Sequence, residues 1–509
     1  MTNRYDAIVI GAGNSGLASS IALSQAGKKT LLVEKNYKPG GYATTFIRGN
    51  YEFEGSLKHI SGVGNKNNPG PLYKIFQKMG VIDKLPLVEL PTERVITGPY
   101  DMSFSTKGGD AYQATLLKNF PEEEEAINKF FDMAKECWRE FQEIYNYNLD
   151  KVDVYEDFDL EASKEKYPVF FKYAFQNGLQ VLGQYFKNPY LIYAITHLSM
   201  YSGAIPKLSF LDLMIFPIYY FAYPAQHFIG GSGAESNALA EQFKEKGGEL
   251  KLGTPVKQIL VEDGKAIGIE TSNGERYYAD TIISAASPLV TYEEMVAPKD
   301  LPATAISDYN GYENFTSFVE VHLGLDCSSE ELGVKDANNY IFDPVHSEKG
   351  ILCVFSLDSV TPKNEVDAVS GASEHLDVPD KTHYGKLDIS IGTNPQDWLE
   401  LPPSEYFNKK YEIAEQTIKN TEKYFPGIRD HIVEMNVTTP LTMIRFSGAP
   451  GGSISGLGGT LADFLLHPKK LDNKIENLYI ENPGMHAFGG YQGTLSYGYA
   501  LGEKLGQEE

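Results

Sequence analysis

Three glycines and one glutamate near the start of the chain have the types and the spacing of a nucleotide-binding site. Gly11, Gly13 and Gly16 follow the apolar segment 6–10, and Glu34 stands 23 residues beyond Gly11. Gly11 suits a tight turn, Gly13 lets a pyrophosphate approach the backbone, and Gly16 lets a helix pack closely on its strand. The Glu34 carboxylate can accept hydrogen bonds from ribose hydroxyls and repels a 2′-phosphate. The pattern therefore predicts a dinucleotide site that disfavours NADP.

The elements that must position these residues are visible around them. The segment 6–10 reads as a strand, 17–26 as a helix and 30–33 as a second strand that ends at Glu34 and Lys35. Asn14 and Ser15, in the turn just before this helix, are candidates for contacts with the cofactor, and the N-terminal N–H groups and partial positive charge of the helix favour phosphate. A glycine-rich turn alone is weak evidence, but the strand, helix, strand and acid in register predict a Rossmann-like unit.

Two later glycine motifs resemble those of a known superfamily. Residues 38–45, Lys-Pro-Gly-Gly-Tyr-Ala-Thr-Thr, resemble the extended fingerprint of FAD-dependent amine oxidases and phytoene desaturases. This resemblance implies that FAD is the cofactor and that Gly40, Gly41 and Thr44 wrap its pyrophosphate. Residues 477–503 are similar to the terminal motif of phytoene desaturases, carotenoid isomerases and retinol saturases. That likeness implies further FAD contacts by Gly484, Gly490, Gly493 and Thr494, with His486, Gly489 and Gly498 on the same pattern. Asn482 and Tyr497 depart from it, where the family usually has glycine and serine.

The same resemblance implies a discontinuous nucleotide domain. The strand that begins near Val256 matches the superfamily's return to its FAD domain, in which that residue's backbone contacts adenine. The expected fold class is α/β, with a Rossmann-like FAD-binding domain and an inserted α+β substrate domain. The expected FAD-binding domain comprises 1–70, 226–299 and 421–509, and the substrate domain comprises 71–225 and 300–420. Helical patterns dominate the first insertion, whereas the second reads as strands near 315–323, 350–357 and 386–391, a surface loop at 358–382 and a helix at 404–424.

Composition excludes several classes of partner. A formal charge of −23 and a pI near 4.9 argue against nucleic acid or an anionic membrane surface. Cys137, Cys327 and Cys353 are far apart and outside any CxxC pattern, so neither a disulfide framework nor a metal site is expected. The N-terminus shows no signal-peptide pattern, and Asp212, Pro217 and Pro224 interrupt the apolar stretch 210–228. These features predict a cytoplasmic protein, with any membrane contact peripheral and hydrophobic.

Candidate catalytic residues are few, because in this superfamily the flavin itself exchanges the hydride. His59 lies where retinol saturases and carotenoid isomerases bring a turn to the flavin face, and it could shuttle a proton or simply pack in a turn. His486 could donate to flavin or substrate or pack in its loop. Arg445 could neutralise a carboxylate or form a surface ion pair.

An aromatic-rich series from 167 to 223 has two interpretations. It can be the packed core of a helical layer, or it can line a tunnel for a long apolar ligand. Under the second interpretation the substrate-binding candidates are Tyr193, Phe216, Tyr219 and Phe221.

The resemblance covers nearly the whole chain and implies an enzyme. The expected reaction is hydride transfer to or from a carbon–carbon double-bond system, or its isomerisation, in a carotenoid, retinoid or unsaturated fatty acid. Only one dinucleotide unit is present, so no second site for NAD(P)H is expected. Two alternatives remain open: an FAD-dependent amine oxidase, and a non-catalytic lipid carrier of the GDP dissociation inhibitor type.

Overall fold

The computed structural model describes most of the chain. The described residues are 3–106, 108–148, 160–202, 205–214, 223–309, 317–342, 352–356, 385–454, 456, 472–482 and 490–507. Several predictions lie outside them, namely the loop 358–382 and the roles of Phe216, Tyr219, Phe221, Gly484 and His486.

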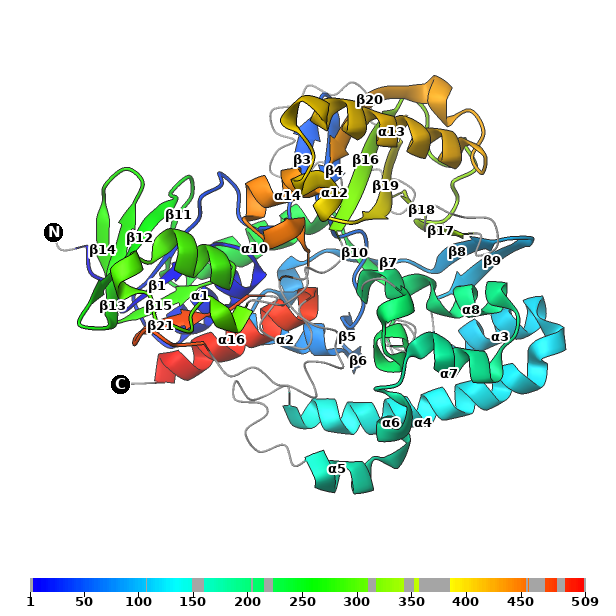
Figure 1. The fold of residues 1–509 in the computed structure, drawn as a ribbon, viewed down its shortest axis with the longest axis horizontal. Coiled ribbons are helices and arrows are strands. Elements are labelled where there is room, and N and C mark those ends of the chain that lie inside the picture. Colours follow the sequence, from blue (N-terminus) through cyan, green and yellow to red (C-terminus); the bar gives the residue numbers. More distant parts are fainter. Residues whose placement is uncertain are drawn as a thin grey trace.

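A five-stranded parallel sheet forms the core of the first domain (Figure 1). Its order is β11 (Glu249–Lys251), β2 (Thr30–Val33), β1 (Ala7–Ile10), β15 (Thr281–Ser284) and β21 (Leu478–Ile480). The chain leaves β1 towards β2 on one side and later returns as β15 on the other. The carboxyl end of β1 is therefore the topological switch point, where open parallel sheets bind ligands.

Both faces of this sheet are covered. One apolar cluster joins the sheet to α1 (Asn14–Gln25), α2 (Pro71–Met79), α10 (Gly231–Glu245) and α16 (Tyr491–Gln507). A second cluster joins the opposite face to an antiparallel meander of β12 (Val256–Glu262), β13 (Lys265–Thr271) and β14 (Arg276–Tyr278). These elements agree with the strand and helix pattern predicted for the nucleotide domain, and they confirm the expected α/β fold class.

A seven-stranded mixed sheet forms the core of the second domain. Its order is β20 (Ile432–Thr438), β16 (Ser317–Leu325), β19 (Lys386–Thr393), β18 (Leu352–Phe355), β17 (Asn338–Phe342), β8 (Thr92–Thr97) and β9 (Tyr100–Ser105). One apolar cluster packs this sheet against α3 (Gly109–Asn119), α4 (Glu124–Asn148), α6 (Pro168–Tyr173), α7 (Gly178–Tyr185) and α8 (Pro189–Thr196). Another packs it against α12 (Gln396–Leu399) and α13 (Tyr406–Glu422).

Three of these strands differ from the sequence-based expectation. The segment 71–225 supplies β8 and β9 as well as helices, and 421–509 supplies β20 to the seven-stranded sheet. The pairing partners explain the difference, because β8 pairs with β17 and β20 with β16, more than 100 residues away in each case.

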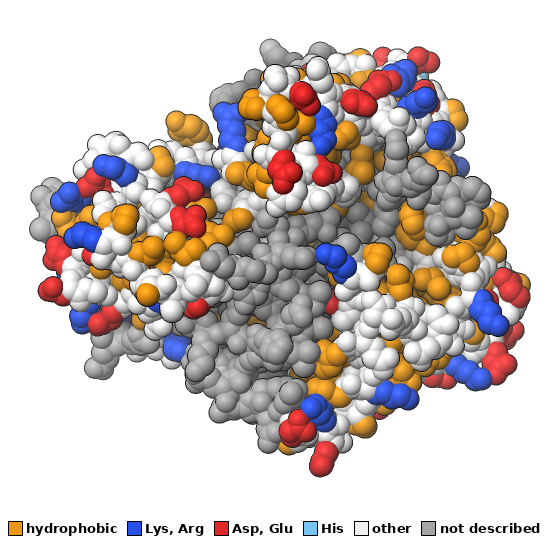
Figure 2. All heavy atoms as spheres, viewed as in Figure 1, with side chains coloured by type: hydrophobic (Ala, Val, Ile, Leu, Met, Phe, Trp, Pro, Cys, Tyr) orange, Lys and Arg blue, Asp and Glu red, His pale blue; other side chains and the backbone are white. Residues whose placement is uncertain are grey.

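The surface is mixed in character. Figure 2 shows acidic and basic side chains scattered over the visible face, with hydrophobic side chains between them. Within the described parts of the chain, no helix combines the length and the apolar character needed to cross a membrane.

Candidate active site

The turn after β1 has the geometry of a phosphate cradle. Gly11 adopts a positive φ of 96°, and its N–H donates to the Val33 carbonyl at 2.8 Å. A Cβ on Gly16 would lie 1.9 Å from the Gly11 oxygen, so only glycine fits where α1 meets the turn. A Cβ on Gly13, in contrast, would meet no atom of a described residue within 4 Å. Gly13 also starts α1 without a side-chain cap, which leaves the first helical N–H groups for an anion.

The Pro-Gly-Gly turn closes the other side of this cradle. The Gly40 N–H donates to the Ala12 carbonyl at 2.7 Å, and Gly40 forms a bridge with Gly13. Gly41 has a φ of 62°, and a Cβ there would lie 3.4 Å from Gly13 Cα. Thr44 is fixed nearby because its carbonyl accepts the Gly55 N–H at 2.8 Å. The two glycine turns, separate in the sequence, thus form one site.

Glu34 is held rigidly at the end of β2. Its carboxylate accepts hydrogen bonds from the Ala12 N–H at 2.8 Å and from the Asn36 N–H and side-chain amide at 2.8 and 2.9 Å. A carboxylate offers about four lone-pair positions. Protein donors therefore take three of them and leave about one for a ribose hydroxyl, fewer than the sequence pattern alone suggests.

Two segments near Glu34, at the start of β12 and the end of β2, lie where the adenine of a bound nucleotide is expected. The Thr254 N–H donates to the Glu34 carbonyl at 2.7 Å, which brings the start of β12, with Val256, close to the ribose-binding end of β2. Lys35 is exposed beside the same strand end and lies 3.5 Å from the Arg445 carbonyl. These positions fit the predicted adenine contact of Val256.

Helix α16 packs against α1 through small residues. A Cβ on Gly498 would lie 2.5 Å from the Ser15 oxygen, and one on Gly502 would lie 2.4 Å from the Ser19 oxygen. The two helices therefore run side by side in the same direction, with their N-termini at the same end of the sheet. Gly490 directly precedes α16 and Gly493 lies in its first turn, where Thr494 is buried with its hydroxyl donating to the Gly490 carbonyl at 3.1 Å.

Three buried polar groups face one another beside these helix starts. The Tyr491 hydroxyl interacts with the Glu235 carboxyl and with the Asn14 side chain, and both affect the pKa of Tyr491. Tyr491 Oη, Asn14 Oδ1 and Glu235 Oε1 nevertheless make no hydrogen bond within normal limits of distance and angle to a described residue. Such incompletely satisfied groups can accommodate water or a ligand atom. The open face of Gly13 and the uncapped start of α1 are the features that fit the pyrophosphate of a dinucleotide.

Two buried carboxyls at this site were not predicted from the sequence. The Glu54 side chain accepts hydrogen bonds from the Ser232 N–H, at 2.8 Å, and from the Ser232 hydroxyl. Burial raises the pKa of Glu54 to about 7. It also raises the pKa of Glu235, which lies one turn after Ser232 on α10, to about 8. Both groups can therefore hold a proton near neutral pH. The sequence offered a signal for Glu235, which is an acid set among small residues near the start of α10.

A buried ion network joins the site to the seven-stranded sheet. Lys58 Nζ lies 3.0 Å from Asp388 and 3.2 Å from Glu320, and it donates to the Glu54 carbonyl at 3.1 Å. His322 contacts the second Asp388 oxygen at 2.6 Å. The acidic neighbours raise the pKa of Lys58, and Lys58 lowers that of Asp388 despite their burial. Lys58 is therefore a charged, fully paired lysine, which the sequence did not single out.

His59 lies between the two domains. Asn338, on β17, donates its side-chain amide to His59 Nδ1 at 3.2 Å. Burial lowers the pKa of His59 to about 3 and that of neighbouring His227 to about 4. His59 is thus neutral at physiological pH, and it can accept or relay a proton but does not carry a spare one. The role of His59 in catalysis stays a prediction, limited to accepting or relaying a proton.

The remaining candidates lie apart from this cluster. Arg445 is exposed on α14 (Pro440–Ser447), with its guanidinium 5.7 Å from the Phe446 ring centre, so its position favours the surface interpretation. Tyr193 is buried in the helical layer, with its ring 4.5 Å from that of Phe342 and its hydroxyl unpartnered among the described residues. The described members of the aromatic series lie in or against the same core cluster, as the packing interpretation expects.

The raised pKa values predict a pH-dependent stability. An unfolded glutamate releases its proton near pH 4.5, whereas folded Glu235 holds it to about pH 8, so stability is lost as the pH rises through this window. We expect Glu235→Gln to stabilise the apoprotein by about 2 kcal/mol more at pH 9 than at pH 5, measured by urea unfolding. Glu241→Gln, at an exposed position of the same helix, should show no such difference. Identical pH profiles for the two variants would contradict the burial argument.

Comparison with known proteins identifies the family. The protein-family model described as "Flavin containing amine oxidoreductase" matches residues 14–356 of the chain. The chain is 27% identical to prolycopene isomerase 1 of an Oncidium hybrid cultivar, across 93% of this chain and 79% of that one. It is 25% identical to the all-trans-retinol 13,14-reductase of Danio rerio, across 98% and 86%. The fold matches an oxidoreductase from Methanosarcina mazei with a TM-score of 0.64, at 16% identity over 97% and 99% of the two chains. The resemblance noted in the glycine motifs is confirmed: the chain belongs to the flavin-containing amine oxidoreductase family and is an FAD-dependent enzyme.

Proposed function

We propose that the enzyme changes carbon–carbon double bonds in a long apolar molecule with conjugated bonds, such as a carotenoid or retinoid. The observation that carries this proposal is the similarity, over more than nine-tenths of the chain, to an isomerase of prolycopene and a reductase of retinol. Both names describe reactions at polyene double bonds.

Some residues of the site would bind the cofactor, and others would exchange protons. Gly13, Gly40, Gly41 and the N-terminus of α1 would hold the pyrophosphate of FAD, and Glu34 would hold the ribose. Bound FAD supplies reversible hydride exchange with carbon. The chain's own contribution is control of protons beside the nucleotide cradle: the Glu54 and Glu235 carboxyls hold one near neutral pH.

Isomerisation is favoured over net reduction by the number of nucleotide units. Among the described residues there is one strand–glycine–helix unit of the dinucleotide type, and FAD takes it. A net reductase needs a continuing electron donor, which would have to bind transiently. An isomerase needs reduced flavin only in catalytic amounts and regenerates it in each turnover.

Anaerobic incubation of the photoreduced enzyme with polyenes tests this proposal. We expect prolycopene or a retinoid to return with unchanged mass and shifted double-bond geometry, as read by chromatography and mass spectrometry. A gain of two hydrogens would instead support the reductase form of the same proposal. If no polyene reacts and a primary amine reduces the oxidised flavin, the enzyme is an amine oxidase and the proposal fails.

The predicted cytoplasmic location, peripheral membrane contact and apolar tunnel remain predictions.

A further inference from the structure

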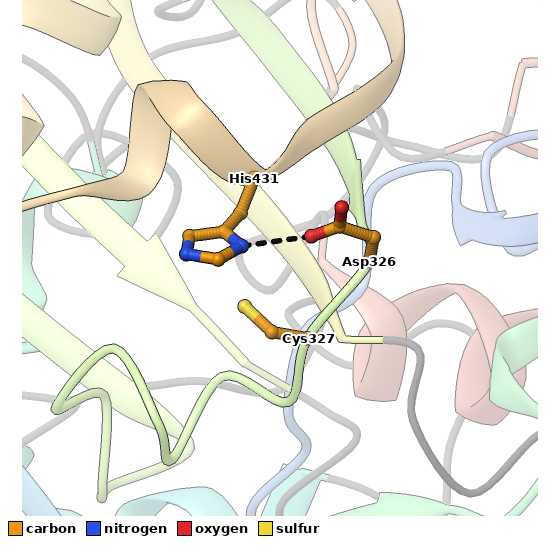
Figure 3. Close-up of side chains that lie close together, drawn as sticks. All are labelled: Asp326, Cys327 and His431. Carbon is orange, nitrogen blue, oxygen red and sulfur yellow. Dashed lines mark hydrogen bonds and ion pairs between the residues drawn. The ribbon is translucent and has the colours of Figure 1, made fainter.

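Three potential metal ligands converge at one end of the β16–β20 pair, away from the residues that form the nucleotide cradle. Asp326 and Cys327 follow β16 directly, and His431 ends a short 3-10 helix, Ile428–His431, just before β20. Figure 3 shows the three side chains turned towards one another. One ligand atom from each lies within 4.8 Å of the other two, and His431 Nδ1 is 2.8 Å from Asp326 Oδ1.

The backbone around these side chains is fixed by hydrogen bonds. The Asp326 N–H donates to the His431 carbonyl at 3.1 Å, which ties the ends of the two strands together. The Cys327 carbonyl accepts the Gly385 N–H at 2.7 Å, and the Tyr51 hydroxyl donates to the Leu325 carbonyl at 2.8 Å. Only side-chain rotation is therefore needed to adjust the three ligands, and a site with a fixed frame costs little entropy to order.

We propose that Asp326, Cys327 and His431 bind a divalent transition-metal ion, with Zn²⁺ as the expected ion. Three atoms within 4.8 Å of one another lie within about 2.8 Å of a common point, against bond lengths of about 2.0–2.3 Å for zinc. A shift of about half an ångström per ligand closes that difference. A metal at this point would take the place of the contact between His431 Nδ1 and Asp326 Oδ1.

The donor set selects the ion. A thiolate and an imidazole suit zinc and disfavour Ca²⁺ and Mg²⁺, which prefer oxygen ligands. Three protein ligands leave a fourth position for water, and Asp326 is exposed, so the site can be reached from solvent. The net charge of −23 raises the local concentration of cations. Sequence spacing gave no hint of this site, because His431 is separated from Cys327 by 104 positions.

The proposal is tested by equilibrium dialysis of the FAD-loaded protein, with its cysteine thiols reduced, against Zn²⁺, followed by elemental analysis. We expect one tightly bound zinc per chain and sulfur in its coordination shell by X-ray absorption. Cys327→Ser and Asp326→Asn should each weaken zinc binding at least about tenfold. Asp430→Asn removes the same charge next to His431 from an exposed side chain outside the cluster, and it should bind zinc like the parent.

Any one of three results would overturn the inference. The first is a parent zinc affinity no higher than that of Cys327→Ser, and the second is a zinc coordination shell without sulfur. The third is a loss of zinc affinity in Asp430→Asn as large as that in Asp326→Asn. Flavin absorbance and the unfolding midpoint without zinc should be unchanged in all variants, which excludes misfolding as the cause. Since zinc is read directly, the result does not depend on the proposed polyene chemistry.

Discussion

Lys58→Met should lower the free energy of unfolding by about 3–5 kcal/mol. The substitution keeps an unbranched side chain of similar length but removes the cation that Asp388 and Glu320 face at 3.0 and 3.2 Å. Both carboxylates are more than nine-tenths buried, so an uncompensated negative charge would remain in the interior. Chemical denaturation of the apoprotein followed by circular dichroism measures the change.

Two further variants separate this charge effect from loss of a lysine in general. Lys129→Met removes an exposed lysine from an ion pair with Glu125 on α4, and we expect no measurable change. Adding Asp388→Asn to Lys58→Met should restore part of the lost stability, because the two groups are in direct contact. If Lys58→Met is as mild as Lys129→Met, the network does not hold the two domains together.

The local parts of the nucleotide domain could be predicted from the sequence. The segment from β1 through Gly11, Gly13 and Gly16 to Glu34 is specified by neighbours along the chain, through alternation, turn chemistry and helix starts. Helix α13 could be predicted for the same reason. The glycine motifs also identified the cofactor, through their resemblance to those of FAD-dependent amine oxidases and phytoene desaturases.

The long-range parts could not be predicted. Strand β8 was missed inside a segment dominated by helical patterns because its partner β17 lies far along the chain. Strand β9 pairs only with β8, across a short turn, so it was missed together with β8, although the β-branched run at 92–97 was a signal. The Lys58–Asp388 pair joins residues 330 positions apart. The protonation of Glu54 and Glu235 depends on burial, which only the tertiary structure sets. What was missed is therefore the chemistry created where the two domains meet.

Gly13→Ala should give a folded protein that has lost its flavin. Gly13 has φ −75° and ψ −179°, which alanine adopts freely, and within the described part of the chain the new methyl group would meet no atom within 4 Å. That same methyl group would occupy the face of the turn that the pyrophosphate approaches. We expect FAD affinity to fall at least about a hundredfold, or about 2.7 kcal/mol, measured by flavin fluorescence titration of the apoprotein.

Gly16→Ala is the matched variant, and it should fail in the opposite way. Its Cβ would lie 1.9 Å from the Gly11 oxygen and 3.3 Å from Ala285 Cβ, so α1 cannot keep its place on the sheet and the first domain should not fold. Gly183→Ala, on α7, should retain both the fold and the flavin, because a Cβ there would meet no atom of the described residues within 4 Å. Parental FAD affinity in Gly13→Ala would show that the cofactor does not lie against this turn, whereas normal folding of Gly16→Ala would show that the helix can shift. A loss of flavin in Gly13→Ala with unchanged circular dichroism assigns the open space above Gly13 to the pyrophosphate, because a defect in folding would move both signals together.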